Sequence, residues 1–428
     1  MNKLAESAHA EAARLLRDPA TIRSRCHAIW QAVEAGRSLH FRVEREALDA
    51  VAERIATLTR RRFPDLQIPY HSRWRHFEAG GIDRKAELDA RLAGRSIAAT
   101  ARARIDLALV SVLLDADAGS AWRYVEAESG QTFNRSEGLA VASLRAFLAG
   151  RFSSIVGEPC RVDARALCAI DASSLGEVFQ VSEANPLPGL YGRAALLRRL
   201  GEALRAQPEC FSAEGQPGHL FDTLTHRHHA PLLHHHRPVP NTNKHHLSAT
   251  RILGALLDAF STIWPSGQAL GELPLGDVWP HPAAGGSGLS AGWVPFHQLS
   301  QWLTYSLLEP FEWAGVHVNS LDELTGLPDH QHGGLLLDAG VLRPLDAGYA
   351  SRPYTPADPW VIEWRALTVA LLDELATRVR RRLGLDEAQL PLARIMEGGS
   401  WAAGLQLAAE KRPGGSPPVQ IHSDGTVF

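Results

Sequence analysis

Apolar residues recur at intervals of three and four along most of this sequence, and no other feature constrains the fold as strongly. The pattern first covers 5–17, 21–35 and 44–62, with Pro19 and Gly36 at the breaks. Such spacing predicts amphipathic helices, and proline and glycine are typical of their ends. Further helices are predicted over 99–116, 136–150, 189–206, 248–262, 297–309, 325–342 (after a turn) and 361–383, with a short one near 321–324. We therefore expect a mainly α protein. A β-hairpin over 122–133 and a strand at the C-terminal end form its small β element.

The net charge argues against nucleic acid as a partner, and the length of the apolar stretches argues against a membrane span. The 428 residues include 44 Lys and Arg and 47 Asp and Glu, for a net charge of −3. Proteins that hold nucleic acid usually carry a basic excess, so no nucleic acid is expected as a partner. No apolar stretch approaches ~20 residues, which argues against a membrane span. The N-terminal helix has acidic residues where a signal peptide would have an apolar core. A cytoplasmic protein is therefore expected.

Nine of the 20 histidines lie between His219 and His246, where the helical pattern breaks. Imidazoles at this density can bind Zn, Ni or Cu, but a structured site needs fixed geometry. The run lies between prolines and lacks HExxH spacing, so we favour a surface insertion with incidental metal affinity. We expect one unit, or two helical lobes over about 1–210 and 248–428 joined by this insertion at 211–247. No metal and no other cofactor is expected, and the four cysteines show no CxxC spacing.

Two clusters of side chains could bind a ligand. The loop 71–77 contains two histidines, two arginines and two aromatic residues. Arginine offers a planar fork to phosphate or carboxylate, and aromatic rings offer a stacking surface. The alternative is a buried loop that closes on neighbouring helices. The second cluster comprises 279–281, 294–298 and 325–330, in which Asp329 stands where a helix is expected to begin. Asp329 either caps that helix or presents a carboxylate to a pocket.

Several long runs, spread over nearly the whole chain, carry a family resemblance. They are HSRWRHFEAGGIDR (71–84), RSEGLAVAS (135–143), NPLPGL (185–190), PLGDVWPHPA (274–283), VPFHQLSQWLTYSLLEP (294–310), LTGLPDHQHGGLLLDAGVL (324–342), EGGSWAAG (397–404) and the final SDGTVF. These runs resemble the family of the fourth protein of the URC route for uracil catabolism. The resemblance implies a role downstream of uracil ring opening, on a ribosyl-urea type intermediate from which urea and the sugar separate.

The order of elements around Asp329 carries a second, more distant resemblance. A hairpin with an aromatic residue, a helix, a long Gln-bearing helix, a Leu-Thr turn and an aspartate resemble the queuosine-salvage nucleosidases. Those all-α proteins hydrolyse an N-glycosidic bond and are related in fold to helix-hairpin-helix DNA glycosylases. The resemblance implies a helical, glycosylase-like architecture. It places the family's aspartate on Asp329, its lysine on Gln298 and its Tyr-Arg pair on His330 and Gln331.

Together these resemblances imply an N-glycosidase that hydrolyses ribosylurea or its 5′-phosphate to urea and ribose (phosphate). Breaking a ribosyl C1′–N bond builds positive charge on the sugar, which a carboxylate stabilises while it deprotonates the attacking water. The predicted catalytic residues are Asp329, Gln298, His297 and His330, with His297, His330 or His281 as the proton donor. Aromatic rings would hold the ureido group and arginines a 5′-phosphate. The predicted substrate-binding residues are His71, Trp74, Arg75, Arg84, Trp279, His281, Phe296, Glu363 and Arg365, the last two by resemblance.

Two other functions stay open. One is a metal-dependent amidohydrolase that uses the histidines to cleave the ureido C–N bond, and the other is a non-catalytic homologue that binds a pathway metabolite. The expected partner is a small ribosyl-urea type molecule in each case, and the sequence leaves the oligomeric state open. Only four residues are lysines, and none lies within 294–342. A Schiff-base mechanism built on the long helix is therefore not expected.

Overall fold

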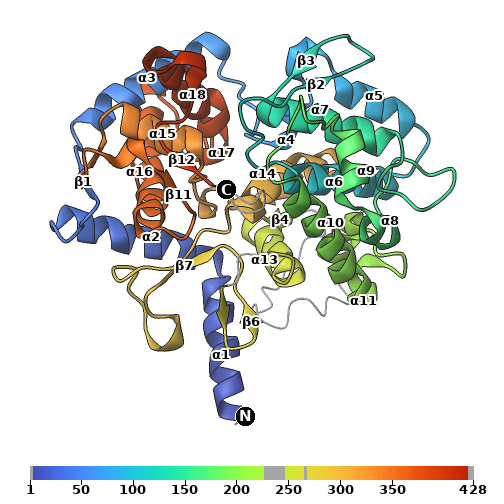
Figure 1. The fold of residues 1–428 in the computed structure, drawn as a ribbon, viewed down its shortest axis with the longest axis horizontal. Coiled ribbons are helices and arrows are strands. Elements are labelled where there is room, and N and C mark those ends of the chain that lie inside the picture. The colour runs from blue at the N-terminus through green and yellow to red at the C-terminus, as the bar shows by residue number, and fades with distance from the viewer. Residues whose placement is uncertain (1–2, 226–245, 265–267, 423–428) are drawn as a thin grey trace. The chain divides into compact units, whose positions relative to one another are not determined.

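Helices make up most of the structure, as the apolar spacing predicts. It is a computed structural model that describes residues 3–225, 246–264 and 268–422 (Figure 1). These residues form two compact units. The first contains 3–71, 268–301 and 320–422, and the second contains 72–225, 246–264 and 302–319. This division differs from lobes over about 1–210 and 248–428, because the N-terminal helices share a unit with the C-terminal ones. Residues 226–245 of the expected insertion lie outside the described part of the chain.

The first unit is organised around one long helix, α16 (Pro359–Leu383). Its other helices are α1 (Lys3–Leu16), α2 (Pro19–Glu34), α3 (Ala47–Arg62), α15 (His330–Asp338), α17 (Leu392–Ile395), α18 (Trp401–Lys411) and the start of α14 (Gln298–Trp313). α16 packs against α2, α3 and α15. Proline stands at its first position, and Gly384 after its end takes a φ of +70°, which glycine adopts without strain. Because residues 360–372 are all buried, α16 carries Glu363 and Arg365 into the core.

The second unit is mainly helical. Its helices are α4 (Arg73–His76), α5 (Arg84–Arg91), α6 (Ile97–Leu113), α7 (Arg135–Leu148), α8 (Ala164–Ala169), α9 (Ala172–Val178), α10 (Leu190–Arg205), α11 (Pro208–Phe211), α12 (Leu220–Thr225) and α13 (Ala249–Phe260), followed by the rest of α14. Residues 105–113 of α6 are buried on every side. α6 packs against α7, α10 and α12 and is the centre of this unit.

All the sheets in the described residues have two strands. The antiparallel pairs are β1 (Phe41–Val43) with β10 (Leu342–Pro344), β2 (Tyr124–Val125) with β3 (Thr132–Phe133), β5 (Ala269–Leu270) with β6 (Leu273–Pro274), and β7 (Val278–Pro280) with β8 (Trp293–Pro295). The parallel pairs are β4 (His246–Ser248) with β9 (His317–Asn319) and β11 (Pro353–Tyr354) with β12 (Gln420–Ile421). The predicted hairpin is confirmed as β2–β3. β12 is the described part of the expected C-terminal strand, whose residues 423–428 lie outside the description.

The sequence predicts no helix between 383 and the C-terminal strand. In the structure, the glycine-rich section there forms helices. α17 runs into a π-helical turn over Met396–Ser400 and then into α18. A Cβ on Gly399 would lie 2.6 Å from the carbonyl oxygen of Ile55, and one on Gly404 would lie 2.3 Å from that of Gln331. These glycines therefore let helices approach closely instead of ending them. Within 63–84, where no helix is predicted, the short α4 forms. The sequence also does not predict α8 and α9, which are too short for an apolar period to register.

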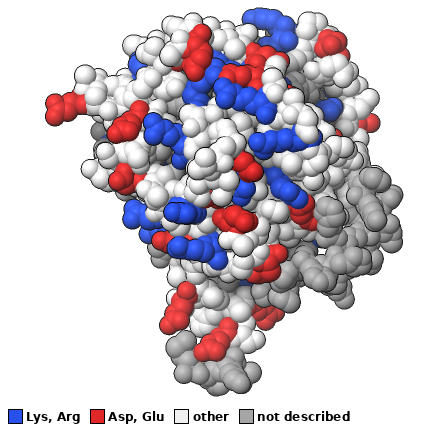
Figure 2. Space-filling model, turned by 90° about the vertical axis from the view of Figure 1, so that its right-hand side faces the viewer, with Lys and Arg blue, Asp and Glu red and all other residues white. Residues whose placement is uncertain are grey.

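The surface mixes charges of both signs. On the face drawn in Figure 2, Lys and Arg side chains lie intermingled with Asp and Glu side chains, as a net charge close to zero leads one to expect. Among the described residues, the helices are all too short or too polar to cross a lipid bilayer. The relation to helix-hairpin-helix glycosylases stays a prediction.

Candidate active site

Asp329 is the N-cap residue of α15, and a single neighbour holds its carboxylate. Oδ1 accepts a hydrogen bond from the backbone N–H of His332 at 2.8 Å, and Oδ2 lies 3.0 Å from Nδ1 of the same residue. The Asp329 side chain keeps 17% of its surface exposed. Burial works to raise its pKa, but the charge and both hydrogen bonds of His332 outweigh burial and lower the pKa. Asp329 thus caps the helix, as one of the two interpretations requires, and remains an ionised, partly exposed carboxylate.

The chain of hydrogen bonds continues behind His332. Nε2 of His332 lies 3.0 Å from Oγ of Ser400, the last residue of the π-helical turn. Because Nδ1 faces a carboxylate, it carries the imidazole proton, and Nε2 accepts from the serine hydroxyl. His332 and Ser400 are fully buried. The sequence reasoning missed both. The spacing of three from Asp329 to His332 is a usable signal, since an N-cap side chain faces the third helical residue. Ser400 stands in the EGGSWAAG run, but no local spacing links it to His332.

The predicted residue His71 lies beside this chain. Its Nδ1 is 3.1 Å from Oε2 of Glu397, whose Oε1 accepts a hydrogen bond from Arg62 at 2.9 Å. The His71 ring is 6.4 Å from the His332 ring and 5.9 Å from that of Trp401. Burial works to raise the pKa of Glu397, but contacts with His71 and Arg62 lower it. The Asp329 region is therefore backed by a second carboxylate–imidazole pair.

A buried carboxylate that was not predicted binds three of the predicted residues. Arg365 donates to Asp277 through two nitrogens, at 2.8 and 2.7 Å. Asp277 also accepts from Nε1 of Trp279 at 2.6 Å and from the backbone N–H of Gln298 at 3.0 Å. The guanidinium of Arg365 lies 4.2 Å from the ring centre of Phe296. Burial works to raise the pKa of Asp277, but the charge and hydrogen bonds of Arg365 lower it. Asp277 thus fixes the start of α14.

The side-chain amide of Gln298 has a defined orientation. Arg365 donates to its oxygen at 3.2 Å. A guanidinium has no acceptor, so the amide must turn its oxygen toward Arg365 and its NH2 group away. Among the described residues, that NH2 group has no hydrogen-bond partner. Gln298 is therefore a pre-set donor at the start of α14.

Three predicted proton donors differ in what their imidazoles contact. His297, at a φ of +46°, lies 2.9 Å through Nε2 from the carbonyl oxygen of Leu16, and burial lowers its pKa. In His281, Nδ1 accepts from a backbone N–H, which leaves the proton on Nε2, 3.4 Å from Glu363. Glu363 also accepts from the hydroxyl of Ser38. His330 follows Asp329, is half-buried, and has its ring 6.3 Å from that of Trp364.

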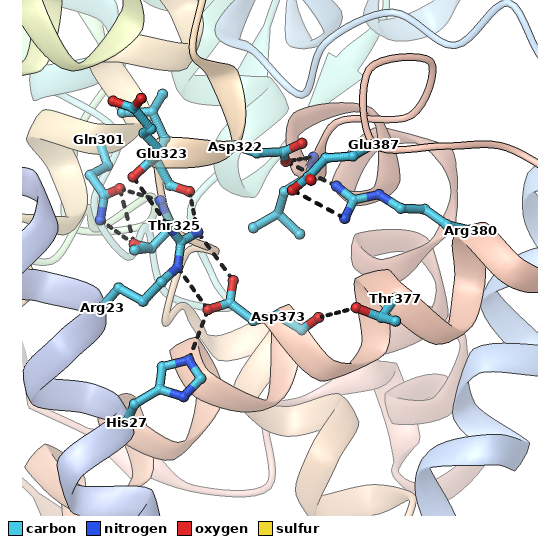
Figure 3. Close-up of polar contacts among 12 residues, drawn as sticks. Arg23, His27, Gln301, Asp322, Glu323, Thr325, Asp373, Thr377, Arg380 and Glu387 are labelled. Carbon is cyan, nitrogen blue, oxygen red and sulfur yellow. Dashed lines mark hydrogen bonds and ion pairs between the residues drawn. The ribbon is translucent and has the colours of Figure 1, made fainter.

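The turn that leads to Asp329 is tied to three helices (Figure 3). From α14, Gln301 bonds to both the N–H and the hydroxyl of Thr325, at 2.9 and 2.7 Å. From α2, Arg23 donates to the carbonyl oxygen of Leu324 at 2.9 Å and to Asp373 of α16 at 2.9 Å. This network leaves the backbone before Asp329 little freedom to move.

Three of the predicted binding residues lie in the second unit and are engaged within it. Trp74 is buried and donates to the carbonyl oxygen of Ser306 at 2.9 Å. Arg75 pairs with Glu309 at 2.9 Å. Arg84 is 0% exposed, and its nitrogens bond to Glu126 and to two backbone carbonyls. The buried-loop interpretation holds here. The assignment of Trp74, Arg75 and Arg84 to substrate stays a prediction, and the contacts named above for these side chains are with the fold.

The described residues offer little for a metal ion. Within 3–225, 246–264 and 268–422, no group of three or more His, Cys, Asp and Glu side chains is arranged to hold one. Most of the histidine-rich run lies outside these ranges. His219, at its described edge, lies 3.2 Å from Asp222.

Comparison with known proteins gives matches along nearly the whole chain. "Uracil catabolism protein 4" of Lachancea kluyveri is 37% identical over 421 residues, which cover 92% of this chain and 93% of that protein. "Protein urg3" of Schizosaccharomyces pombe is 36% identical over 416 residues, covering 95% and 96%. Residues 15–428 match the family described as "Protein of unknown function (DUF1688)". The resemblance seen in the sequence runs is confirmed, and the chain belongs to the DUF1688 family.

Proposed function

We propose that this protein acts in uracil catabolism as an N-glycosidase, which hydrolyses ribosylurea or its 5′-phosphate to urea and ribose (phosphate). The role in uracil catabolism is supported by the name of the relative in Lachancea kluyveri, which is similar over nearly its whole length. The chemistry of the first unit supports the reaction.

The observation that carries the proposal is the state of Asp329. Its carboxylate is ionised, partly exposed and held in one plane by two hydrogen bonds from His332. A carboxylate has about four lone-pair directions, so two stay available for a ligand. Cleavage of a ribosyl C1′–N bond passes through a cation-like sugar, which a fixed anion stabilises without having to reorganise. An anion held in this way suits glycosidic hydrolysis.

The remaining steps need a base, an acid and a hydrogen-bond donor. Water attacks C1′ and gives a proton to Asp329, while the electrons of the C1′–N bond leave with the urea nitrogen, which takes up a proton. His330 is the proposed acid, because it directly follows Asp329 at the start of α15. The protons of His297 and His281 face the Leu16 carbonyl and Glu363. The NH2 group of Gln298 is the proposed donor to the ureido oxygen.

The test measures urea released from synthetic ribosylurea and from its 5′-phosphate by the purified protein. Asparagine caps helices nearly as well as aspartate, so Asp329→Asn keeps the fold and removes the charge. We expect it to lower the rate about 10²- to 10⁴-fold. Asp171→Asn is the matched control, because Asp171 is the N-cap of α9, and it should leave the rate unchanged.

Three other results would decide against the proposal. Urea release by Asp329→Asn at the wild-type rate would remove Asp329 from the chemistry. Ammonia in place of urea would favour hydrolysis of the ureido C–N bond. Binding of ribosylurea with no turnover under any condition would identify a non-catalytic homologue.

A further inference from the structure

We propose that His332 and Ser400 are positioning residues for Asp329, forming a buried Asp329–His332–Ser400 chain that holds the carboxylate in its working orientation. The inference rests on the function proposed above. It assigns a task to two buried polar side chains that the reaction scheme leaves unused.

The geometry constrains the carboxylate from both ends of His332. The backbone N–H and Nδ1 of this residue each bind one carboxylate oxygen, which fixes the carboxylate plane. Ser400 binds the far ring nitrogen at 3.0 Å and so fixes the ring itself. An aspartate, an imidazole and a hydroxyl in this order form the arrangement by which a third group orients a base. Here the exposed end is the aspartate and the buried end is the serine.

The hydroxyl at the buried end fixes the tautomer of His332. A serine hydroxyl donates to Nε2, which leaves the ring proton on Nδ1, facing Asp329. In His281 the order is reversed, because a backbone N–H, which can only donate, occupies its Nδ1. We therefore expect the Nδ1–H of His332 to be the ring donor that holds Asp329.

The charged groups around α15 are few. His332 and His71 are the titratable groups whose charge acts on Asp329. His71 is paired with Glu397, which also binds Arg62.

The other elements packed on α15 contribute little charge near Asp329. α16 presents the uncharged Trp364 to His330, and α18 presents Trp401 to His71. Arg412, after α18, pairs with Asp338, and Arg343 of β10 lies beside Gly340, both at the opposite end of α15. A loss of activity can thus be traced to the hold of His332 on Asp329 by comparing variants.

The experiment compares kcat and KM in four variants. Ser400→Ala should lower kcat about 10-fold with KM unchanged. His332→Leu, which removes the donor to Asp329, should lower kcat about 10- to 100-fold. His332→Asn keeps an N–H donor, so it should restore most of kcat. Ser143→Ala, a buried serine bonded to Ser111, is the control and should change nothing.

A proton resonance gives a readout that does not depend on these variants folding. The wild type should show a low-field signal from the Nδ1–H of His332, which disappears in Asp329→Asn. If Asp329→Asn is inactive while Ser400→Ala and His332→Leu keep wild-type kcat, the positioning role is wrong and the proposed function stands. Absence of the low-field signal in the wild type would also overturn the positioning role. If Asp329→Asn is fully active, the proposed function itself is wrong.

Discussion

Asp277 illustrates how one buried side chain can organise many others. Its carboxylate binds Arg365 and Trp279, and its backbone carbonyl accepts from the N–H groups of Phe296 and His297. Such a carboxylate fixes neighbours that come from separate parts of the chain. Removing one charge of a buried ion pair costs more free energy than the intact pair contributes, because the remaining charge stays buried without its partner.

Asp277→Asn should therefore destabilise the protein strongly. The change keeps the shape but leaves the Arg365 guanidinium buried without its counter-charge, at a cost of about 3–5 kcal/mol. Urea-induced unfolding measures the loss, and urea release should fall as Gln298 loses its orientation. Asp49→Asn, which removes an exposed partner of Arg382, is the control and should leave the unfolding midpoint nearly unchanged. Equal midpoints for Asp277→Asn and the wild type would contradict the argument.

The residues of the candidate site were predicted only in part. Trp279 and Gln298 stand in the runs that carry the resemblance, and Arg365 was assigned by it; the structure places all three around one carboxylate. Asp277 and Ser400 also stand in such runs, but neither was predicted as a site residue. The reason is physical: the Asp277–Arg365 pair spans 88 residues and the His332–Ser400 bond spans 68. A local pattern carries no record of which distant groups will meet.

At the scale of elements, the spacing of apolar residues predicted the long helices. A high glycine content led to the wrong expectation that a glycine-rich segment would not be helical. Glycine in a helix lowers its intrinsic stability, so the sequence around 397–404 did not predict α18. In the structure, Gly404 lies against Gln331 of α15, the helix that carries Asp329 at its start. The close approach of the two helices compensates for the low helix propensity. The pairing of β1 with β10 is another contact between distant segments that spacing could not predict.

Gly404→Ala tests this close approach. In an ordinary helix the change stabilises by about 1 kcal/mol. Here the new Cβ would lie 2.3 Å from a backbone oxygen of Gln331, so α15 and α18 must separate. We expect a loss of about 1–3 kcal/mol in the free energy of unfolding, together with slower urea release. The control is Gly176→Ala in α9, where the nearest atom is a leucine methyl at 3.4 Å. A stabilised Gly404→Ala variant would refute the packing argument.

At the scale of the whole molecule, both units rely on buried carboxylates held as anions. In the first unit, contacts lower the pKa values of Asp277, Asp329 and Glu397 despite their burial. In the second unit, burial works to raise the pKa of Glu126, but hydrogen bonds from Arg84, Ser129 and Arg145 bring it down to about 2. Asp106 behaves oppositely, since burial raises its pKa to about 7.

These opposing shifts predict how stability depends on pH. A group whose pKa is lowered by folding contributes stability above its unfolded value, near pH 4, and that contribution is lost as the pH falls toward the folded value. Asp106 contributes fully below about pH 4, and its contribution is lost as the pH rises through about 7. Four of these five carboxyl groups have a lowered pKa, and only Asp106 has a raised one. We therefore expect acid to destabilise the protein more than a change from pH 5 to pH 7 does.

Urea unfolding at pH 7, 5, 4 and 3 should therefore show a midpoint that rises from pH 7 to pH 5, as Asp106 regains its contribution, and falls below about pH 4. The variant Glu126→Gln isolates the contribution of one carboxylate to this pH dependence. Glutamine cannot ionise, whereas the folded protein holds the pKa of Glu126 at about 2. The variant should be less stable at pH 7 and should lose less of its midpoint between pH 5 and pH 3. Glu128→Gln, an exposed neighbour in the same hairpin turn, should follow the wild-type curve. A midpoint that stays level down to pH 3, or an equal slope for Glu126→Gln and wild type, would show that these buried ion pairs do not govern acid stability.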